Sequence, residues 1–151
     1  MKFVASLAIA AAAMTLAGPA SAQFAKPEDA IKYRQSAMYI MNQHFGRIAA
    51  MANGRVPYDA KVALDNAELV AEMARLPWPA YGAGTDKGAP TRAKAEIWSD
   101  SAKFKEHNEK LMADTVKLVA AAKTNNLDSI KTAVGPVANN CKSCHDAFRG
   151  N

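Results

Sequence analysis

The chain contains only two cysteines and three histidines among its 151 residues. It has no second C-x-x-C motif and no H-x-x-x-H motif, so the two cysteines cannot complete the ligand shell of a zinc site. Strand signals, internal repeats and clusters of Lys and Arg are also missing. Beyond residue 22, no apolar run approaches the ~20 residues that a membrane-spanning helix needs. These absences argue against a zinc protein, a β fold, a nucleic-acid-binding protein and a membrane-spanning mature chain.

The first 22 residues have the pattern of a secretory signal peptide. Lys2 precedes an apolar stretch from Phe3 to Leu16, and small residues with an A-x-A cleavage site follow at 20–22. A membrane anchor is the alternative, but the apolar stretch is short of a bilayer span and Gly18-Pro19 ends it. We therefore predict a cleaved signal peptide at 1–22, export to a bacterial periplasm, and one mature domain at 23–151.

Four segments carry apolar residues at helical spacing: 27–51, 59–76, 99–124 and 128–148. Pro27 opens the first, Asp59 is a candidate N-cap of the second, and Asn-Gly or Asn-Asn pairs follow the first and third. Short connections join the members of each pair, and a longer loop, 77–94, joins the pairs. This order predicts an all-α, antiparallel up-down four-helix bundle.

The spacing also predicts which residues face the core. Pro136 is the irregular position, because it removes a backbone hydrogen bond and should kink or re-initiate the last helix. The loop 77–94 either covers part of a ligand pocket or is a surface loop anchored by Trp78 and Tyr81. The predicted inward-facing residues are Ile31, Met38, Met41, Phe45, Ile48 and Ala52; Val62, Asn66, Leu69, Met73 and Leu76; Phe104, Leu111, Thr115 and Leu118, widened by Met112, Val116 and Val119; and Ile130, Val134, Val137, Cys141, Cys144 and Phe148.

The sequence Cys141-Lys142-Ser143-Cys144-His145 is the attachment signature of a c-type haem. Two cysteine sulfurs form thioethers with the porphyrin, and the adjacent histidine binds the iron. On a helix these three residues share one face, and the cysteines fall on the predicted core stripe, which places one covalent haem c inside the bundle. A redox dithiol or a structural disulfide is the alternative interpretation of the cysteine pair.

Arg34 lies on the predicted buried stripe of the first helix, with Gln35 beside it. A buried guanidinium is costly unless it is paired, and a haem propionate would pair it. Alternatively, Arg34 extends its charged end to water and Gln35 is a solvated neighbour.

The residue opposite His145 decides the function of such a haem. A methionine there makes a low-spin electron carrier, whereas an apolar site leaves the iron open to small gases. The candidates are Met38, Met41, His44 and His107, of which Met38 lies one turn beyond Arg34 on the same face. It either ligates or fills the space over the ring as an apolar plug.

In these features the chain resembles cytochrome c′, the class II c-type cytochromes, and most strongly those of denitrifying proteobacteria. The haem motif near the end, the exported four-helix bundle and an early Lys32-Tyr33-Arg34-Gln35 segment carry the likeness. It extends over the whole mature chain and includes Gln23 to Ala30, His44-Phe45-Gly46-Arg47, Leu76-Pro77-Trp78, Glu96-Ile97-Trp98-Ser99-Asp100 and Cys141 to Arg149.

The resemblance implies a non-enzymatic protein with a five-coordinate, high-spin iron that binds NO and CO and transfers electrons to a redox partner that is not identified. Cys141 and Cys144 would hold the haem, and His145 would be the axial ligand. Arg34 and Gln35 would contact the propionate side, Met38 and Tyr81 would line the distal pocket, and Arg149 would lie near the imidazole. It also implies a homodimer formed through the first two helices.

Three other functions remain open at this stage. Low-spin relatives called cytochrome c-556 use a methionine of the first helix as sixth ligand, which here would be Met38. A peroxidase-like enzyme would need a general acid or base over the iron, where the first helix offers Met38 and Met41. A dithiol protein would contain no haem at all.

Overall fold

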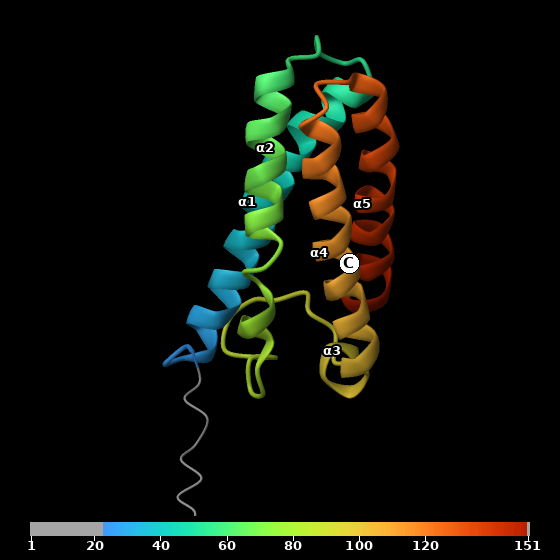
Figure 1. Ribbon diagram of the computed structural model, residues 1–151. Helices are drawn as coiled ribbons and strands as arrows, with labels where there is room; N and C mark the ends of the chain where they lie inside the picture. The colour runs from blue at the N-terminus through green and yellow to red at the C-terminus, as the bar shows by residue number, and fades with distance from the viewer. Residues whose placement is uncertain (1–22, 151) are drawn as a thin grey trace, which may run out of the picture.

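The computed structural model describes residues 23–150, and within them the chain forms an all-α bundle (Figure 1). The predicted signal peptide, residues 1–22, lies outside the described residues. The four long helices are α1 (Pro27–Ala52), α2 (Ala60–Met73), α4 (Ser101–Ala122) and α5 (Leu127–Phe148). A 3₁₀ turn η1 (Trp78–Tyr81) and a short helix α3 (Glu96–Ser99) belong to the connection between α2 and α4. The predicted bundle and its helix order are confirmed.

The helix ends follow the local signals in the sequence. Pro27 occupies the first turn of α1, and Gly54 adopts φ +69° just after its end. The Asp59 side chain accepts a hydrogen bond of 2.9 Å from the Val62 amide and so caps α2. The α2 helix ends at Met73, three residues before the predicted end, and Pro77 follows four residues later.

The last helix, α5, is one continuous helix across Pro136, so the expected re-initiation is wrong. It begins where Asn125 adopts a left-handed conformation, φ 53°, and Asn126 accepts hydrogen bonds from the Asp128 and Ser129 amides. Pro136 is exposed, which leaves room for its ring on the outer face. As a result, α5 carries both the bundle core in its first half and the C-x-x-C-H motif in its second.

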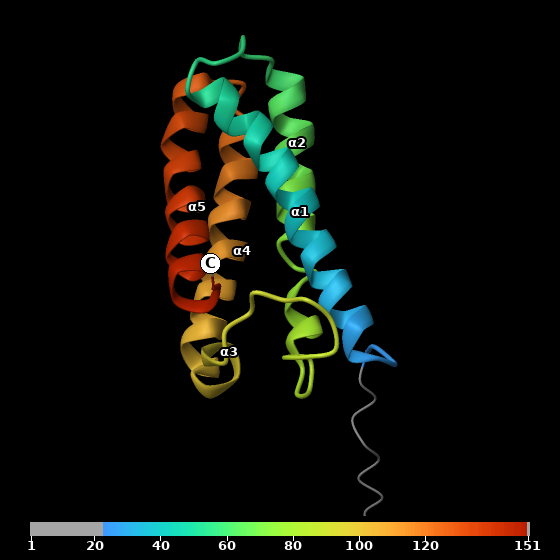
Figure 2. The ribbon, with the colours of Figure 1, turned by 180° about the vertical axis from the view of Figure 1, so that it is seen from behind.

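Each long helix packs against two others, in the order α1, α2, α4, α5 and back to α1 (Figures 1 and 2). The core between them contains Ile48, Val70, Leu118, Ile130 and Val137, all almost completely buried. No helix in the described part of the chain is both long and apolar enough to cross a membrane.

One helix, α2, buries a different face from the one that we predicted, and in α4 a single predicted position differs. In α2 the buried residues are Ala63, Asn66, Ala67 and Val70, whereas Val62 and Leu69 are exposed, and so is Leu76 after its end. Val116 of α4 is also exposed. The predicted stripe of α2 is therefore wrong at Val62, Leu69 and Leu76, whereas Asn66 is buried as predicted. Small alanines on the buried side suit close packing against the neighbouring helices.

The loop after η1 crosses one end of the bundle between α1 and α5, as Figure 2 shows from behind. At its far end it pairs with the chain that follows α5: Ala93 forms an antiparallel bridge with Arg149. The Lys94 amide donates to the Phe148 carbonyl at 3.0 Å, and the Gly150 amide donates to the Arg92 carbonyl at 2.7 Å. The loop thus fastens the end of the helix that carries the cysteine motif.

Candidate functional site

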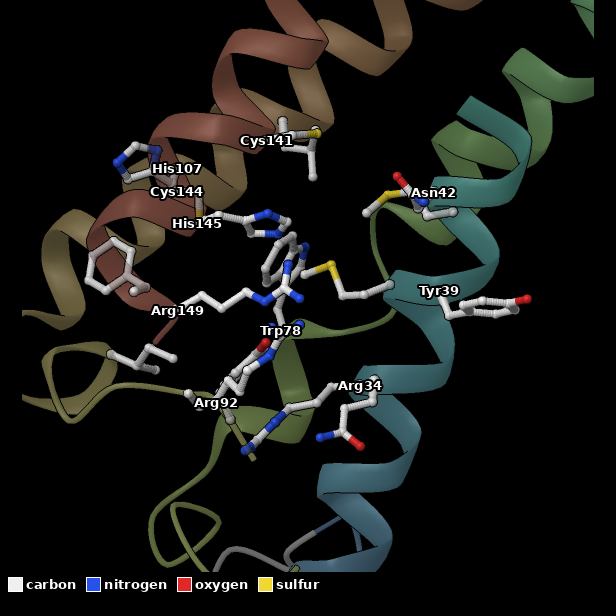
Figure 3. A pocket seen from close by; sticks show the side chains of 18 of the residues that line it. Arg34, Tyr39, Asn42, Trp78, Arg92, His107, Cys141, Cys144, His145 and Arg149 are labelled. Atoms are coloured by element: carbon white, nitrogen blue, oxygen red, sulfur yellow. The ribbon is translucent and has the colours of Figure 1, made fainter. Parts of the chain in front are cut away.

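A cavity of about 850 Å³ opens between α1, η1, the loop, α4 and α5 (Figure 3). This volume is near the upper end of the range for small-molecule sites. Most of its wall is apolar or aromatic, which suits a large flat ligand. The apolar wall residues are Met38, Met41, Phe45, Val70, Trp78, Tyr81, Ile97, Phe104, Leu111, Val137 and Phe148.

The α5 wall of the cavity contains Cys141, Cys144 and His145. Both cysteines are half-buried and have free thiols in this structure. The three side chains come from adjacent turns of one helix, as their spacing predicts. Two sulfurs and an imidazole therefore meet the same cavity.

Burial keeps both thiols protonated. Desolvation raises the pKa of Cys141 above its ordinary value. It raises the pKa of Cys144 to about 11, with a further contribution from the charge of Cys141. Redox-active dithiols depend instead on a lowered thiol pKa, so this pair does not have the electrostatics of a thioredoxin-like centre.

The same surroundings keep the His145 imidazole neutral. Desolvation lowers the pKa of His145, the positive charge of Arg92 lowers it further, and Asp146 opposes the change. A neutral imidazole has the free nitrogen lone pair that an axial ligand of haem iron needs.

Arg34 lies inside the molecule, with 2% of its surface exposed, so the alternative in which it reaches water is wrong. One terminal nitrogen donates to the Ala80 carbonyl at 2.8 Å and to the Thr85 hydroxyl at 3.0 Å. The other donates to the Thr85 carbonyl at 2.9 Å and to the Thr91 hydroxyl at 3.3 Å. The guanidinium also lies 4.4 Å from the centre of the Tyr81 ring, a cation–π contact.

The neighbouring α1 residues divide between the loop and the cavity. The Gln35 amide donates to the Pro90 carbonyl at 3.0 Å, which adds a second tie to the loop. Met38 and Met41 line the cavity from α1, opposite the α5 wall. Desolvation raises the pKa of Tyr81, whose ring contacts Trp98 and Phe104. The loop thus covers part of the pocket, one of the two interpretations that the sequence left open.

The other two histidines, His44 and His107, do not place an imidazole on the α1 side of the cavity. His44 is not among the lining residues, and its Nδ1 lies 2.8 Å from the Asn66 amide oxygen. His107 lines the cavity from α4, where its Nδ1 lies 3.1 Å from the Asn140 oxygen and its ring packs edge-on against Phe148. The side of the cavity formed by α1 therefore offers thioethers and no imidazole.

Sequence reasoning missed one charged residue of the site, Arg92, which lines the cavity together with Arg34 and Arg149. Figure 3 shows the labelled Arg92 and Arg149 side chains entering from the loop and from the end of α5. Arg92 has no helical periodicity to place it. Its one signal is its position in a loop that is longer than a bundle connection needs.

The charges of the wall provide a test of whether haem fits here. Three arginines line the cavity and no Asp or Glu does, as far as the described residues go. A haem is a flat apolar ring with two propionate groups, so an apolar wall that is positive at its polar positions matches it in both shape and charge. The two thiols and the neutral imidazole add the groups that a covalent haem requires.

The fold and this site together define a haem c protein built on a helical bundle. Comparison with known proteins identifies the family. The sequence profile described as Cytochrome C' matches residues 29–149. Cytochrome c′ of Rubrivivax gelatinosus is 53% identical over 127 residues, which cover 84% of this chain and 98% of that protein. Cytochrome c′ of Alcaligenes xylosoxydans, a denitrifier, is 48% identical over 127 residues, which also cover 84% of this chain and 98% of that protein.

Solved structures agree with the sequence comparison. The crystal structure of the Rubrivivax gelatinosus protein superposes with a TM-score of 0.82 and covers 84% of this chain and 99% of its own. A nitric oxide complex of a variant of the Alcaligenes xylosoxidans protein, 46% identical, superposes with a TM-score of 0.80 and covers 85% of this chain and 99% of its own. The chain belongs to the cytochrome c′ family, whose members carry a covalently attached haem c.

Proposed function

We propose that this chain is a periplasmic haem protein that binds NO and CO at a five-coordinate, high-spin iron. The observation that supports it is the contrast between the two walls of the cavity. The α5 wall has an imidazole, whereas the α1 wall has Met38 and Met41 and neither a base nor a carboxylate. A bound haem supplies one exchangeable coordination position, and the protein decides what can reach it.

The described residues suggest a division of roles. Cys141 and Cys144 hold the one haem of the chain through thioethers, and His145 is the axial ligand. Met38, half-buried in the α1 wall, restricts the distal space, and Tyr81 lines it. Arg34 and Gln35 lie on the propionate side, and Arg149 lies on the side of His145. No residue of this set is placed for acid–base catalysis, which supports a non-enzymatic role.

The gas ligands are supported by relatives. A variant of the Alcaligenes xylosoxidans protein has been solved as a nitric oxide complex, and another with carbon monoxide bound. Both are 46% identical to this chain and superpose with a TM-score of 0.80. Transfer of electrons to a protein partner is a further role that a haem in this cavity permits.

The second candidate function is a low-spin electron carrier in which the Met38 sulfur binds the iron. It is favoured by the position of Met38 in the wall that faces the haem helix. In that case α1 supplies a ligand, and gas binding requires the thioether to leave first.

A visible absorption spectrum of the purified ferric protein separates the two functions. We expect a high-spin spectrum, and in Met38→Ala the same coordination with tighter CO binding, because the smaller side chain enlarges the distal space. Sharp α and β bands on reduction, together with a methionine-to-iron charge-transfer band that is lost in Met38→Ala, would establish the low-spin carrier instead. A colourless protein would exclude both.

The surface supports association into a homodimer through α1 and α2. Six of the seven large apolar side chains that are exposed in the described residues lie on these helices or beside them. Val62, Leu69 and Leu76 recur every seven residues along one side of α2 and its end. Large exposed apolar side chains on two neighbouring helices favour a protein interface there. The six residues are Tyr39, Ile40, Val56, Val62, Leu69 and Leu76.

A further inference from the structure

The covalent bonds proposed above orient the carboxylates of the haem. This step rests on the proposed attachment at Cys141 and Cys144. The thioethers form at the vinyl groups, and the propionates stand on the other pyrroles of the ring, so they point away from the cysteine-bearing face of α5. The cationic residues that line the cavity are Arg34, Arg92 and Arg149 besides the imidazoles, and they are the candidates to meet these two negative charges.

Arg34 has few free N–H groups with which to bind a carboxylate. Both terminal nitrogens already donate twice, to the Ala80 and Thr85 carbonyls and to the Thr85 and Thr91 hydroxyls. A guanidinium has five N–H groups, so one, on Nε, remains. Gln35 likewise donates to the Pro90 carbonyl. These two residues therefore act first as ties that hold the loop against α1.

Arg92 lies between those ties and the end of α5. Its carbonyl accepts from the Gly150 amide at 2.7 Å, and the next residue, Ala93, bridges to Arg149. Its backbone is thus fixed at the edge of the cavity, and its side chain lines the cavity (Figure 3). The side chain makes no hydrogen bond or ion pair with another residue among 23–150.

From this arrangement we infer that Arg92 is a haem-carboxylate-binding residue of this chain, with its guanidinium donating to a propionate at the loop side of the cavity. Arg34 supports it indirectly by holding Thr91, the preceding residue, in place. An arginine suits this position because its planar fork can donate two parallel hydrogen bonds to one carboxylate.

A crystal structure of the haem-loaded protein tests the contact directly. We expect an Arg92 nitrogen within hydrogen-bond distance of a propionate oxygen. An Arg92 side chain directed into solvent, with the propionates held by Arg34 and Gln35, would overturn the inference.

Redox titration of Arg92→Gln, Arg92→Lys and Lys87→Gln gives a second readout. Absorbance and mass first show that each variant carries haem, which tests the proposed attachment separately. A positive charge near the haem stabilises the reduced iron, so its loss makes reduction less favourable. In Arg92→Gln the ratio of reduced to oxidised protein at a fixed potential should therefore fall about two- to fivefold.

Arg92→Lys should recover most of that ratio. Lys87→Gln removes the same charge from the same loop, but Lys87 is exposed and does not line the cavity, so it should leave the ratio unchanged. Equal effects of Arg92→Gln and Lys87→Gln, or no effect of either, would contradict the inference while leaving the haem assignment intact.

Discussion

Arg34 shows how one buried cation organises the site. Its guanidinium is removed from water, which lowers its pKa through desolvation. The charge is compensated by three hydrogen bonds to the loop, one to η1, and the face of the Tyr81 ring. Because these partners lie 46 to 57 residues away in sequence, Arg34 orders the loop relative to α1.

Replacing Arg34 with alanine should destabilise the folded protein by about 2–4 kcal/mol, because buried carbonyls lose their donors and the loop loses its anchor. Denaturant unfolding of the haem-loaded variant measures this. Arg75→Ala, at an exposed position after α2, is the control and should change the free energy of unfolding little. Similar effects of the two substitutions would show that the Arg34 contacts contribute little to stability.

The protonated thiols lead to a prediction about reactivity. The pKa of Cys144 is about 11 in the fold against an ordinary 9, so at pH 8 its thiolate fraction is about 100-fold lower than in the unfolded chain. Alkylation of haem-free protein that retains its helical circular dichroism should be slower by that factor than in denaturant. Between pH 9 and 11 the unfolded thiol ionises first, so the free energy of unfolding of the haem-free protein should decrease as the pH rises through this range.

Among the helices, α2 shows the limit of predicting burial from periodicity. Its sequence contains two apolar stripes at helical spacing, one with Val62 and Leu69 and one with Ala63, Ala67 and Val70. The larger side chains suggested the first stripe as the core, but the second is buried because alanines permit close helix packing. In α1 and α5, where one stripe is clearly more apolar, the predicted residues Ile31, Ile48, Ile130 and Val137 are buried.

Pro136 tests how much strain α5 tolerates. It cannot donate the backbone hydrogen bond that the helix interior requires, yet the helix continues through it. Pro136→Ala should therefore stabilise the protein by about 1–2 kcal/mol after the greater freedom of the unfolded chain is subtracted. Thermal unfolding measures the change. Pro57→Ala, in the exposed segment before α2, should instead lower the stability. If both substitutions raised or both lowered the stability, this account of Pro136 would be wrong.

For the whole molecule, the sequence predicted the bundle and the attachment motif, because each has a local signal. It placed Arg34 on a buried stripe but left open whether its charged end reaches water, and whether the loop 77–94 covers a pocket. It could not predict the hydrogen bonds of Arg34 to Thr85 and Thr91, the bridge from Ala93 to Arg149, or the place of Arg92 in the wall. These contacts join segments about fifty residues apart and depend on how the loop folds back.

The proposed dimer can be tested with a pair of matched substitutions. Leu69→Glu places a charge on the exposed apolar side of α2, and it should shift the protein towards monomer in sedimentation experiments. Val116→Glu makes a similar change on α4, away from the proposed interface, and should leave the mass unchanged. A monomeric parent protein, or equal effects of both variants, would contradict an interface through α1 and α2.

The pairing of the loop with the residues after α5 has a consequence for biogenesis. The chain encircles the cavity: α1 is tied to the loop, the loop to the terminal residues, and those residues to the helix that carries both cysteines. These contacts hold the cysteine-bearing helix against the loop on one side of the cavity. We expect haem attachment at Cys141 and Cys144 to precede the pairing of the loop with residues 148–150, because an open chain gives a planar macrocycle easier access to both sulfurs.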